Sequence, residues 1–191
     1  MLRLRTPTDP TWIDAVRADV DAFLQDHAAN ERKISASALT LAVQYPDRRP
    51  LVDAMVELAR EELEHFARVY ALLTRRGRTL GQDTPDAYMG ALRRLVRKTD
   101  VTEYLLDRLI VFAIVEARAC ERFGLLARQL PDPGLRAFYA DLTRAEARHH
   151  AVFLRLAQRY APPAVVGARL ATLLDAEAAL LAALPVRAAL H

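Results

Sequence analysis

Two stretches decide the fold: Glu62-Leu63-Glu64-His65 and Glu146-Ala147-Arg148-His149. Both have the pattern Glu-x-x-His. On a helix, positions i and i+3 share a face, so each stretch directs a carboxylate and an imidazole at one point. Ten glutamates and five histidines in 191 residues would give roughly 0.3 such patterns by accident, so a single one is weak evidence and two are informative.

Each pattern is preceded by another glutamate at nearly the same distance. Glu31 lies 31 residues before Glu62, and Glu116 lies 30 residues before Glu146. A Pro-Asp pair stands near each midpoint, at 46–47 and 131–132. In an antiparallel hairpin, residues equidistant from the turn lie at the same height, here about 20–25 Å from it. The chain therefore repeats one unit twice: a helix with Glu, a turn, and a helix with Glu-x-x-His.

The remaining sequence has helical periodicity and no strand-like alternation. It predicts helices over 11–18, 20–44, 49–76, 88–96, 101–129, 135–160 and 165–183. Two short turns and one long crossover over 77–99 connect the four long helices. This connectivity predicts an all-α, ferritin-like four-helix bundle with additional short N-terminal and C-terminal helices. We expect a single domain over 1–191, with its core bundle at about 20–160.

Two such hairpins facing each other would bring four carboxylates and two imidazoles into the core. This is the ligand set of ferritin-like di-iron or di-manganese proteins, and it predicts a metal site at Glu31, Glu62, His65, Glu116, Glu146 and His149. Apolar residues one or two turns away support burial, which is costly for an unpaired carboxylate. Any one glutamate alone would be read as a solvated helix residue. Glu121 competes with Glu116, but it matches the height of Glu146 less well.

Other polar residues have weaker assignments. His150 points about 100° away from His149 and is interpreted as lying beside the site or on the surface. His27 lies one turn before Glu31 and is read as an ordinary, partly exposed histidine that could reach the rim of the site. Metal-bound imidazoles usually donate their other N–H to an oxygen, and the candidates are Asp107, Asp141 and Glu57.

Composition narrows the class of protein. The single cysteine, Cys120, excludes an internal disulfide, a thiolate zinc site and an iron–sulfur cluster, and is typical of a cytoplasmic protein. The N-terminus lacks the apolar core of a signal peptide, and the longest apolar stretch is too short to span a bilayer, so no membrane association is expected. A net charge of +3 permits a nucleic-acid partner without requiring one.

The sequence around these glutamates resembles the tRNA 2-methylthio-isopentenyl-adenosine hydroxylase family. The likeness covers about residues 10 to 160. It is carried by the segments 23–33, 61–66, 116–123 and 146–150, which read FLQDHAANERK, EELEHF, EARACERF and EARHH.

This resemblance implies a non-haem di-iron monooxygenase with two Fe ions. It would use dioxygen as co-substrate to hydroxylate the isopentenyl side chain of a modified adenosine in the tRNA anticodon stem-loop. The chain has no flavin or nicotinamide fingerprint, so electrons would come from an external reductase or ferredoxin. All six predicted ligands would then also be catalytic residues. The oligomeric state stays open.

A tRNA substrate needs a basic surface. The candidates are two arginine-rich groups, Arg75, Arg76 and Arg78 and then Arg93, Arg94, Arg97 and Lys98. Such runs at helix ends more often cap carbonyls and solubilise the chain. Tyr88, Tyr104 and Phe112 could stack on the base, although each is more readily explained as core.

Five alternative functions compete with this reading. A ferritin-like iron-binding ferroxidase or storage protein, or a di-iron oxidase acting on another small substrate, would use the same six residues. A rubrerythrin-like peroxidase would need four cysteines for its rubredoxin module, and the chain has one. A quinone hydroxylase would need an apolar face for membrane docking. A metal-free interaction module would bury four unpaired carboxylates, which is the least favourable.

Overall fold

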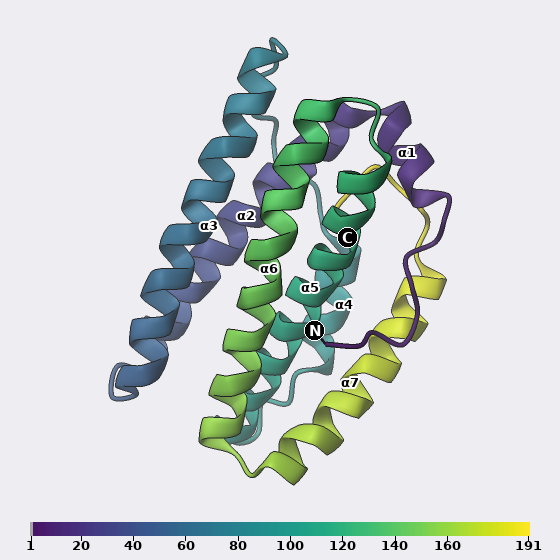
Figure 1. Ribbon diagram of the computed structural model, residues 1–191. Helices are drawn as coiled ribbons and strands as arrows, with labels where there is room; N and C mark the ends of the chain where they lie inside the picture. Colours follow the sequence, from purple (N-terminus) through teal and green to yellow (C-terminus); the bar gives the residue numbers. More distant parts are fainter. Residues whose placement is uncertain (1) are drawn as a thin grey trace. The chain divides into compact units, whose positions relative to one another are not determined.

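The computed structural model describes residues 2–191, and this part of the chain forms seven helices and no strand. The helices are Trp12–Ala18 (α1), Val20–Gln44 (α2), Arg49–Arg75 (α3), Ala87–Leu95 (α4), Val101–Gln129 (α5), Pro133–Tyr160 (α6) and Pro163–Ala183 (α7) (Figure 1). The all-α prediction is confirmed, and every predicted boundary lies within two residues. Helices α6 and α7 begin two residues earlier than predicted, at Pro133 and Pro163. Proline is tolerated in the first helical turn because a backbone N–H there has no hydrogen-bond partner within the helix.

The described residues form two compact units. The first-hairpin unit comprises Asp14–Thr84 and Arg187–Leu190. In it α2 and α3 run antiparallel (Figure 1), and the hydroxyl of Ser35 on α2 donates to the carbonyl of Ala59 on α3 over 2.8 Å. After α3 the chain passes through Gly77 at φ 71°, the left-handed conformation that a C-terminal glycine supplies. This hairpin carries Glu31, Glu62 and His65.

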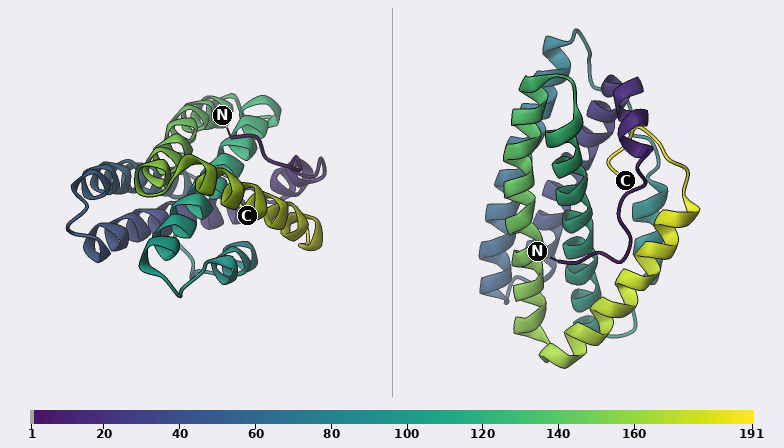
Figure 2. Two further views of the ribbon diagram at one scale, coloured as in Figure 1. Left: turned by 90° about the horizontal axis from the view of Figure 1, so that it is seen from below. Right: turned by 45° about the vertical axis from the view of Figure 1, so that its right-hand side comes forward.

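The second-hairpin unit comprises Pro85–Val186, the N-terminal residues up to Ile13, and His191. Its α5 and α6 form the second antiparallel hairpin, and α7 packs against α4 and α5 (Figure 2). Asp132 caps α6 by accepting hydrogen bonds from two backbone N–H groups of the first turn. Between Leu105 and Phe123, every side chain of α5 except Arg108 and Glu121 is buried. Helix α5 is therefore the centre of this unit.

Two buried ionic contacts hold α7 in the second-hairpin unit. Asp107 on α5 accepts from the Arg97 and Arg169 guanidinium groups, each with a shortest contact of 2.7 Å. Arg118 on α5 donates to both carboxylate oxygens of Glu177 on α7, at 2.9 and 3.1 Å. The hydroxyl of Tyr88 on α4 also donates to Glu177, at 2.9 Å. These pairings fix α4 and α7 against α5.

Candidate metal centre

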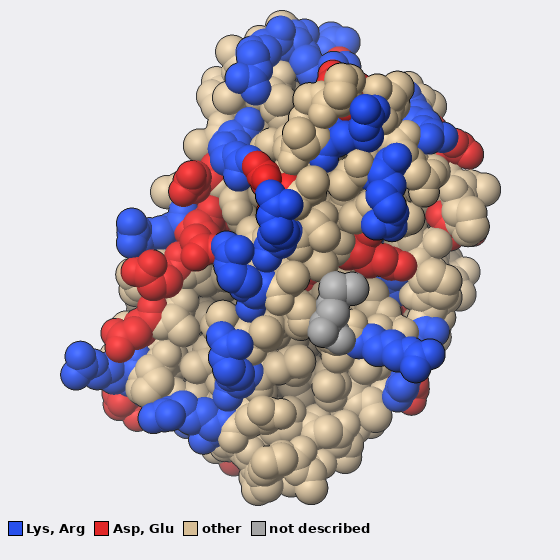
Figure 3. Space-filling model, viewed as in Figure 1, with Lys and Arg blue, Asp and Glu red and all other residues tan. Residues whose placement is uncertain are grey.

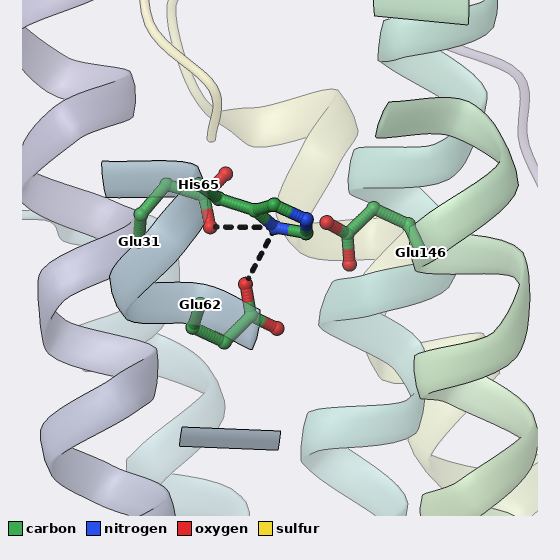
Figure 4. Close-up of side chains that lie close together, drawn as sticks. All are labelled: Glu31, Glu62, His65 and Glu146. Atoms are coloured by element: carbon green, nitrogen blue, oxygen red, sulfur yellow. Dashed lines mark hydrogen bonds and ion pairs between the residues drawn. The ribbon is translucent and has the colours of Figure 1, made fainter. Parts of the chain in front are cut away.

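Glu31, Glu62 and His65 converge within the first-hairpin unit. The Nδ1 atom of His65 lies 3.0 Å from Oε2 of Glu62 and 3.7 Å from Oε2 of Glu31. Figure 4 shows both carboxylates turned toward the same edge of the imidazole ring. The three side chains offer ligand atoms within 4.8 Å of one another, and all three are buried. We call this set the first triad, and its geometry places two carboxylate oxygens and one ring nitrogen around a single point.

His27 is part of this arrangement, and its interpretation as a partly exposed residue is wrong. Its side chain is fully buried, and its Nε2 lies 2.6 Å from Oε1 of Glu31. One helical turn separates the two residues, so the imidazole reaches the carboxylate along the same face of α2. His27 thus holds the oxygen of Glu31 that points away from His65. The i,i+4 spacing in the sequence was the signal for this contact.

The electrostatics of the first triad favour an ionised Glu31 and a protonated His65. Burial raises the pKa of Glu31, but hydrogen bonds from His27 and His65 outweigh it and hold the pKa well below its usual range. Burial lowers the pKa of His65, but its bonds to Glu31 and Glu62 outweigh it and raise the pKa to about 10. A cation is therefore stabilised between these carboxylates, whether it is the imidazolium proton or a metal ion.

Glu116, Glu146 and His149 form the matching set, the second triad, within the second-hairpin unit. The Nδ1 atom of His149 lies 3.0 Å from Oε2 of Glu146, the same distance as in the first triad. Ligand atoms of the three residues lie within 4.8 Å of one another, and all three are buried. Glu116 comes from α5, while Glu146 and His149 come from one face of α6. The duplication predicted from the sequence is thus also a duplication of local geometry.

Cys120 is a buried thiol close to the second triad. Cys120 lies one turn after Glu116, is buried, and donates its thiol to the Thr143 carbonyl over 3.4 Å. Burial raises the pKa of Cys120 to about 11, and the carboxylates of Glu146 and Glu116 contribute to the rise. The sulfur therefore stays a thiol at neutral pH, which leaves carboxylates and imidazoles as the donors.

Glu121, the competitor of Glu116, has a different role. Its carboxylate accepts from the backbone N–H and the hydroxyl of Thr8, at 2.9 and 2.7 Å, and also from Arg118. Glu121 therefore anchors the N-terminal segment to α5. Thr8 is 113 residues away in the sequence, and no local pattern indicated this contact.

The three acids predicted as imidazole partners pair with arginines in the structure. Asp107 binds Arg97 and Arg169, Glu57 lies 3.2 Å from Arg60, and Asp141 binds Arg144. Glu57 and Asp141 are exposed. Glu57 and Asp141 pair with arginines one helical turn away. Asp107 is buried and pairs with arginines 10 and 62 residues away in the sequence.

His150 is buried against the N-terminal segment. Its Nε2 accepts the backbone N–H of Leu2 over 3.2 Å, and its Nδ1 lies 3.1 Å from the Glu146 carbonyl. These partners require a neutral ring protonated on Nδ1, since Nε2 must accept and Nδ1 must donate. Burial lowers the pKa of His150, which favours this neutral form. Of the two positions predicted for His150, beside the site or on the surface, the structure has the first.

A cavity of about 520 Å³ lies in the first-hairpin unit, between α2, Phe66 of α3, and the segments 80–84 and 187–189. Its α2 residues lie about 100–180° around the helix from Glu31, with Ala22 and Ala29 at about 160–180°. The cavity is therefore separate from the first triad.

Within the described residues, no helix is both long enough and apolar enough to cross a membrane.

The two triads suit hard, redox-active divalent metals. Each offers two carboxylates and one imidazole, a donor set that favours iron or manganese over copper. A metal at the first triad would be held by Nδ1 of His65 in place of its proton. His27 would hold the remaining oxygen of Glu31, the kind of outer contact that orients metal ligands.

Comparison with known proteins identifies relatives over most of the chain. The family described as tRNA-(MS[2]IO[6]A)-hydroxylase (MiaE) matches residues 2–191. The tRNA 2-(methylsulfanyl)-N(6)-isopentenyladenosine(37) hydroxylase of Pseudomonas putida is 42% identical over 157 residues, which cover 82% of this chain and 76% of that protein. The protein of the same name from Salmonella typhimurium is 40% identical over 134 residues, which cover 70% of this chain and 48% of that protein.

A solved structure shares the fold. Protein 43 from Synechococcus, described as having aldehyde deformylating oxygenase activity, aligns with a TM-score of 0.89 and 38% identity. The alignment covers 93% of this chain and 88% of that one. This likeness confirms the ferritin-like fold class expected from the duplicated hairpins. Together with the buried Glu/His sets, it supports a di-iron site.

Proposed function

The chain belongs to the tRNA-(MS[2]IO[6]A)-hydroxylase (MiaE) family, and from this premise we propose that it hydroxylates the isopentenyl side chain of 2-methylthio-isopentenyl-adenosine in tRNA. One observation supports this chemistry beyond the family match. The chain holds two buried triads of the same composition and the same Glu–His distance. RNA binding alone does not require two buried sets of carboxylate and imidazole ligands.

We propose that the two triads together hold two irons, with Glu31, Glu62 and His65 from one hairpin and Glu116, Glu146 and His149 from the other. When bound, the irons would supply dioxygen activation for hydroxylation of a C–H bond. Each hairpin carries half of this ligand set, so a single domain containing both is proposed. His27 contacts Glu31 over 2.6 Å, and the α5 side chains on either side of Glu116 are buried.

The protein's own residues shape the reaction environment. Phe112 and Phe153 stack at 5.2 Å between ring centres on α5 and α6, and Phe123 lies one turn beyond Cys120; all three are buried. An apolar lining of this kind protects a strong oxidant from water and from side reactions. The chain supplies no nucleotide cofactor motif, so an external reductase or ferredoxin is proposed as electron donor. A cytoplasmic location, where tRNA and reduced thiols occur, accords with the lone buried Cys120.

The proposal is tested by metal analysis combined with nucleoside mass spectrometry. The wild-type protein should bind about two irons per chain. With a chemical reductant and dioxygen, it should add one oxygen atom to the isopentenyl nucleoside of tRNA. The double variant Glu62→Ala, Glu146→Ala should lose both iron and activity. The matched control is Glu57→Ala, Asp141→Ala, which removes two exposed acids from the same two helices and should retain both.

The possible results separate the alternatives. Iron binding without oxygen transfer to the nucleoside would favour a ferroxidase or storage role. A wild-type protein that stays metal-free after reconstitution with ferrous iron would overturn the assignment of the six ligands.

A further inference from the structure

Four exposed arginines form a line along α6. They are Arg144, Arg148, Arg155 and Arg159. At 100° per residue they fall within an arc of about 60° around the helix, and they span about 22 Å along its axis. We call this set the α6 arginine row. Figure 3 shows Lys and Arg side chains gathered over α6 on this face of the molecule.

The row and the second triad occupy different sides of the same helix. Glu146 and His149 lie about 140–200° around α6 from Arg144, whereas all four arginines lie within about 60° of it. Arg148 is next to His149 in the sequence and lies at the height of the metal ligands. The helix therefore presents cations outward along the stretch that presents ligands inward.

Three of the seven basic residues predicted from the sequence as tRNA contacts are engaged in ion pairs within the protein. Arg76 and Arg78 both pair with Asp21, and Arg97 pairs with Asp107 and Glu103. In the row, Arg144 pairs with Asp141, an exposed i,i+3 contact of the kind that contributes little. Arg155 and Arg159 form no ion pair with any of residues 2–191. At least half of the row therefore keeps its charge available to a partner.

We propose that the α6 arginine row binds consecutive backbone phosphates of the substrate tRNA. A guanidinium group presents a rigid fork of N–H donors that matches the oxygens of a phosphate. A straight row with gaps of four and seven residues, about 6 and 10 Å, suits a linear polyanion better than a single small anion. This inference rests on the proposed tRNA substrate and adds the surface that receives its backbone.

The test compares tRNA binding by wild type and by the variant R144Q/R148Q/R155Q/R159Q. Binding is followed by fluorescence anisotropy of a labelled tRNA at several salt concentrations. Each lost phosphate contact should lower the slope of log K against log salt by about 0.7–0.9, so the four-fold variant should lose about 3 in slope. Its Kd near 0.1 M salt should rise about 10- to 100-fold. The smaller variant R155Q/R159Q should show about half of the slope change.

The matched control is R5Q/R17Q/R49Q/R60Q, which removes the same charge from exposed arginines outside α6. If the control weakens binding as much as the row variant, the effect is general charge and the proposal is wrong. Unchanged tRNA affinity and salt slope in both row variants would also overturn the proposal. If these variants then hydroxylate more slowly with a protein electron donor but not with a chemical reductant, the row binds an acidic electron-transfer protein instead.

Iron content and activity separate this inference from the proposed function. The row variants should keep two irons per chain and retain hydroxylation at tRNA concentrations well above the raised Kd. The Glu62→Ala, Glu146→Ala variant should bind tRNA normally and lose hydroxylation. If the wild type shows no iron-dependent hydroxylation, the proposed function is wrong. If the wild type is active but the row variants bind tRNA as tightly as it does, only the proposed tRNA-binding surface is wrong.

Discussion

Replacing Glu177 by Ala is expected to be among the most destabilising changes outside the two triads. Glu177 and Arg118 are both fully buried, and they share two hydrogen bonds of 2.9 and 3.1 Å. Glu177 also accepts from the Tyr88 hydroxyl at 2.9 Å. The substitution leaves the Arg118 charge and the phenol without this acceptor, in a place that water does not reach.

The magnitude follows from what remains around Arg118. Removing one partner of a buried ion pair costs about 3–5 kcal/mol of unfolding free energy. Arg118 keeps Glu121 and the Thr6 carbonyl, the latter at 2.8 Å, so the lower end of the range, about 3 kcal/mol, is expected. A chain of this size should then melt roughly 6–12 °C lower. The double variant R118M/E177L, which removes both charges and keeps the volume, should recover most of the loss.

Urea unfolding followed by circular dichroism measures these differences in the iron-free protein, so that metal binding does not contribute. Glu177→Gln is the matched control: it keeps the shape and an acceptor for one donor, and it should cost less than Glu177→Ala. A cost below about 1 kcal/mol for Glu177→Ala, or a double variant less stable than Glu177→Ala, would refute the reasoning from an uncompensated buried charge.

Three further predictions concern the triads and the core. His27→Gln removes the 2.6 Å contact to Glu31 and should weaken iron binding about 10- to 100-fold in a chelator competition titration; unchanged affinity would show that Glu31 needs no support from His27. Burial raises the pKa of Asp107, but hydrogen bonds from Arg97 and Arg169 outweigh it and lower the pKa, so its stabilisation is present above the unfolded value near pH 4 and is lost as the pH falls through the folded one. The wild type should therefore have a higher free energy of unfolding than Asp107→Asn at pH 7, and this difference should shrink in acid. A difference that does not change with pH would contradict the reasoning. Phe123→Ala empties a fully buried ring position beside Tyr139 and should cost about 3–5 kcal/mol in urea unfolding, whereas an exposed control such as Val43→Ala should cost little.

The sequence predicted most of the fold because its signals are local. Helical periodicity and proline or glycine at the ends gave every helix within two residues, including the left-handed Gly77. The ligand candidates were also readable, because Glu-x-x-His is a contact within one helical turn. Height matching across a hairpin needs only the rise per residue, and it correctly preferred Glu116 to Glu121 as the companion of Glu146.

Other assignments failed where partners are distant in the chain. Glu121 binds Thr8, Asp107 binds Arg169, and Arg118 binds Glu177, with separations of 113, 62 and 59 residues. No spacing rule connects such pairs. The exposure of His27 was also misjudged, because its surroundings depend on how the helices pack and not on its position along α2.

The sequence alone therefore determined the helices, the doubled hairpin and the six candidate ligands, since each depends on contacts within a turn or on distances along a helix axis. The tertiary structure decided which charges neutralise one another and which arginines remain exposed on α6. These pairings depend on burial, because a buried charge needs an oppositely charged partner close by in the folded protein. The position of that partner in the sequence follows no spacing rule.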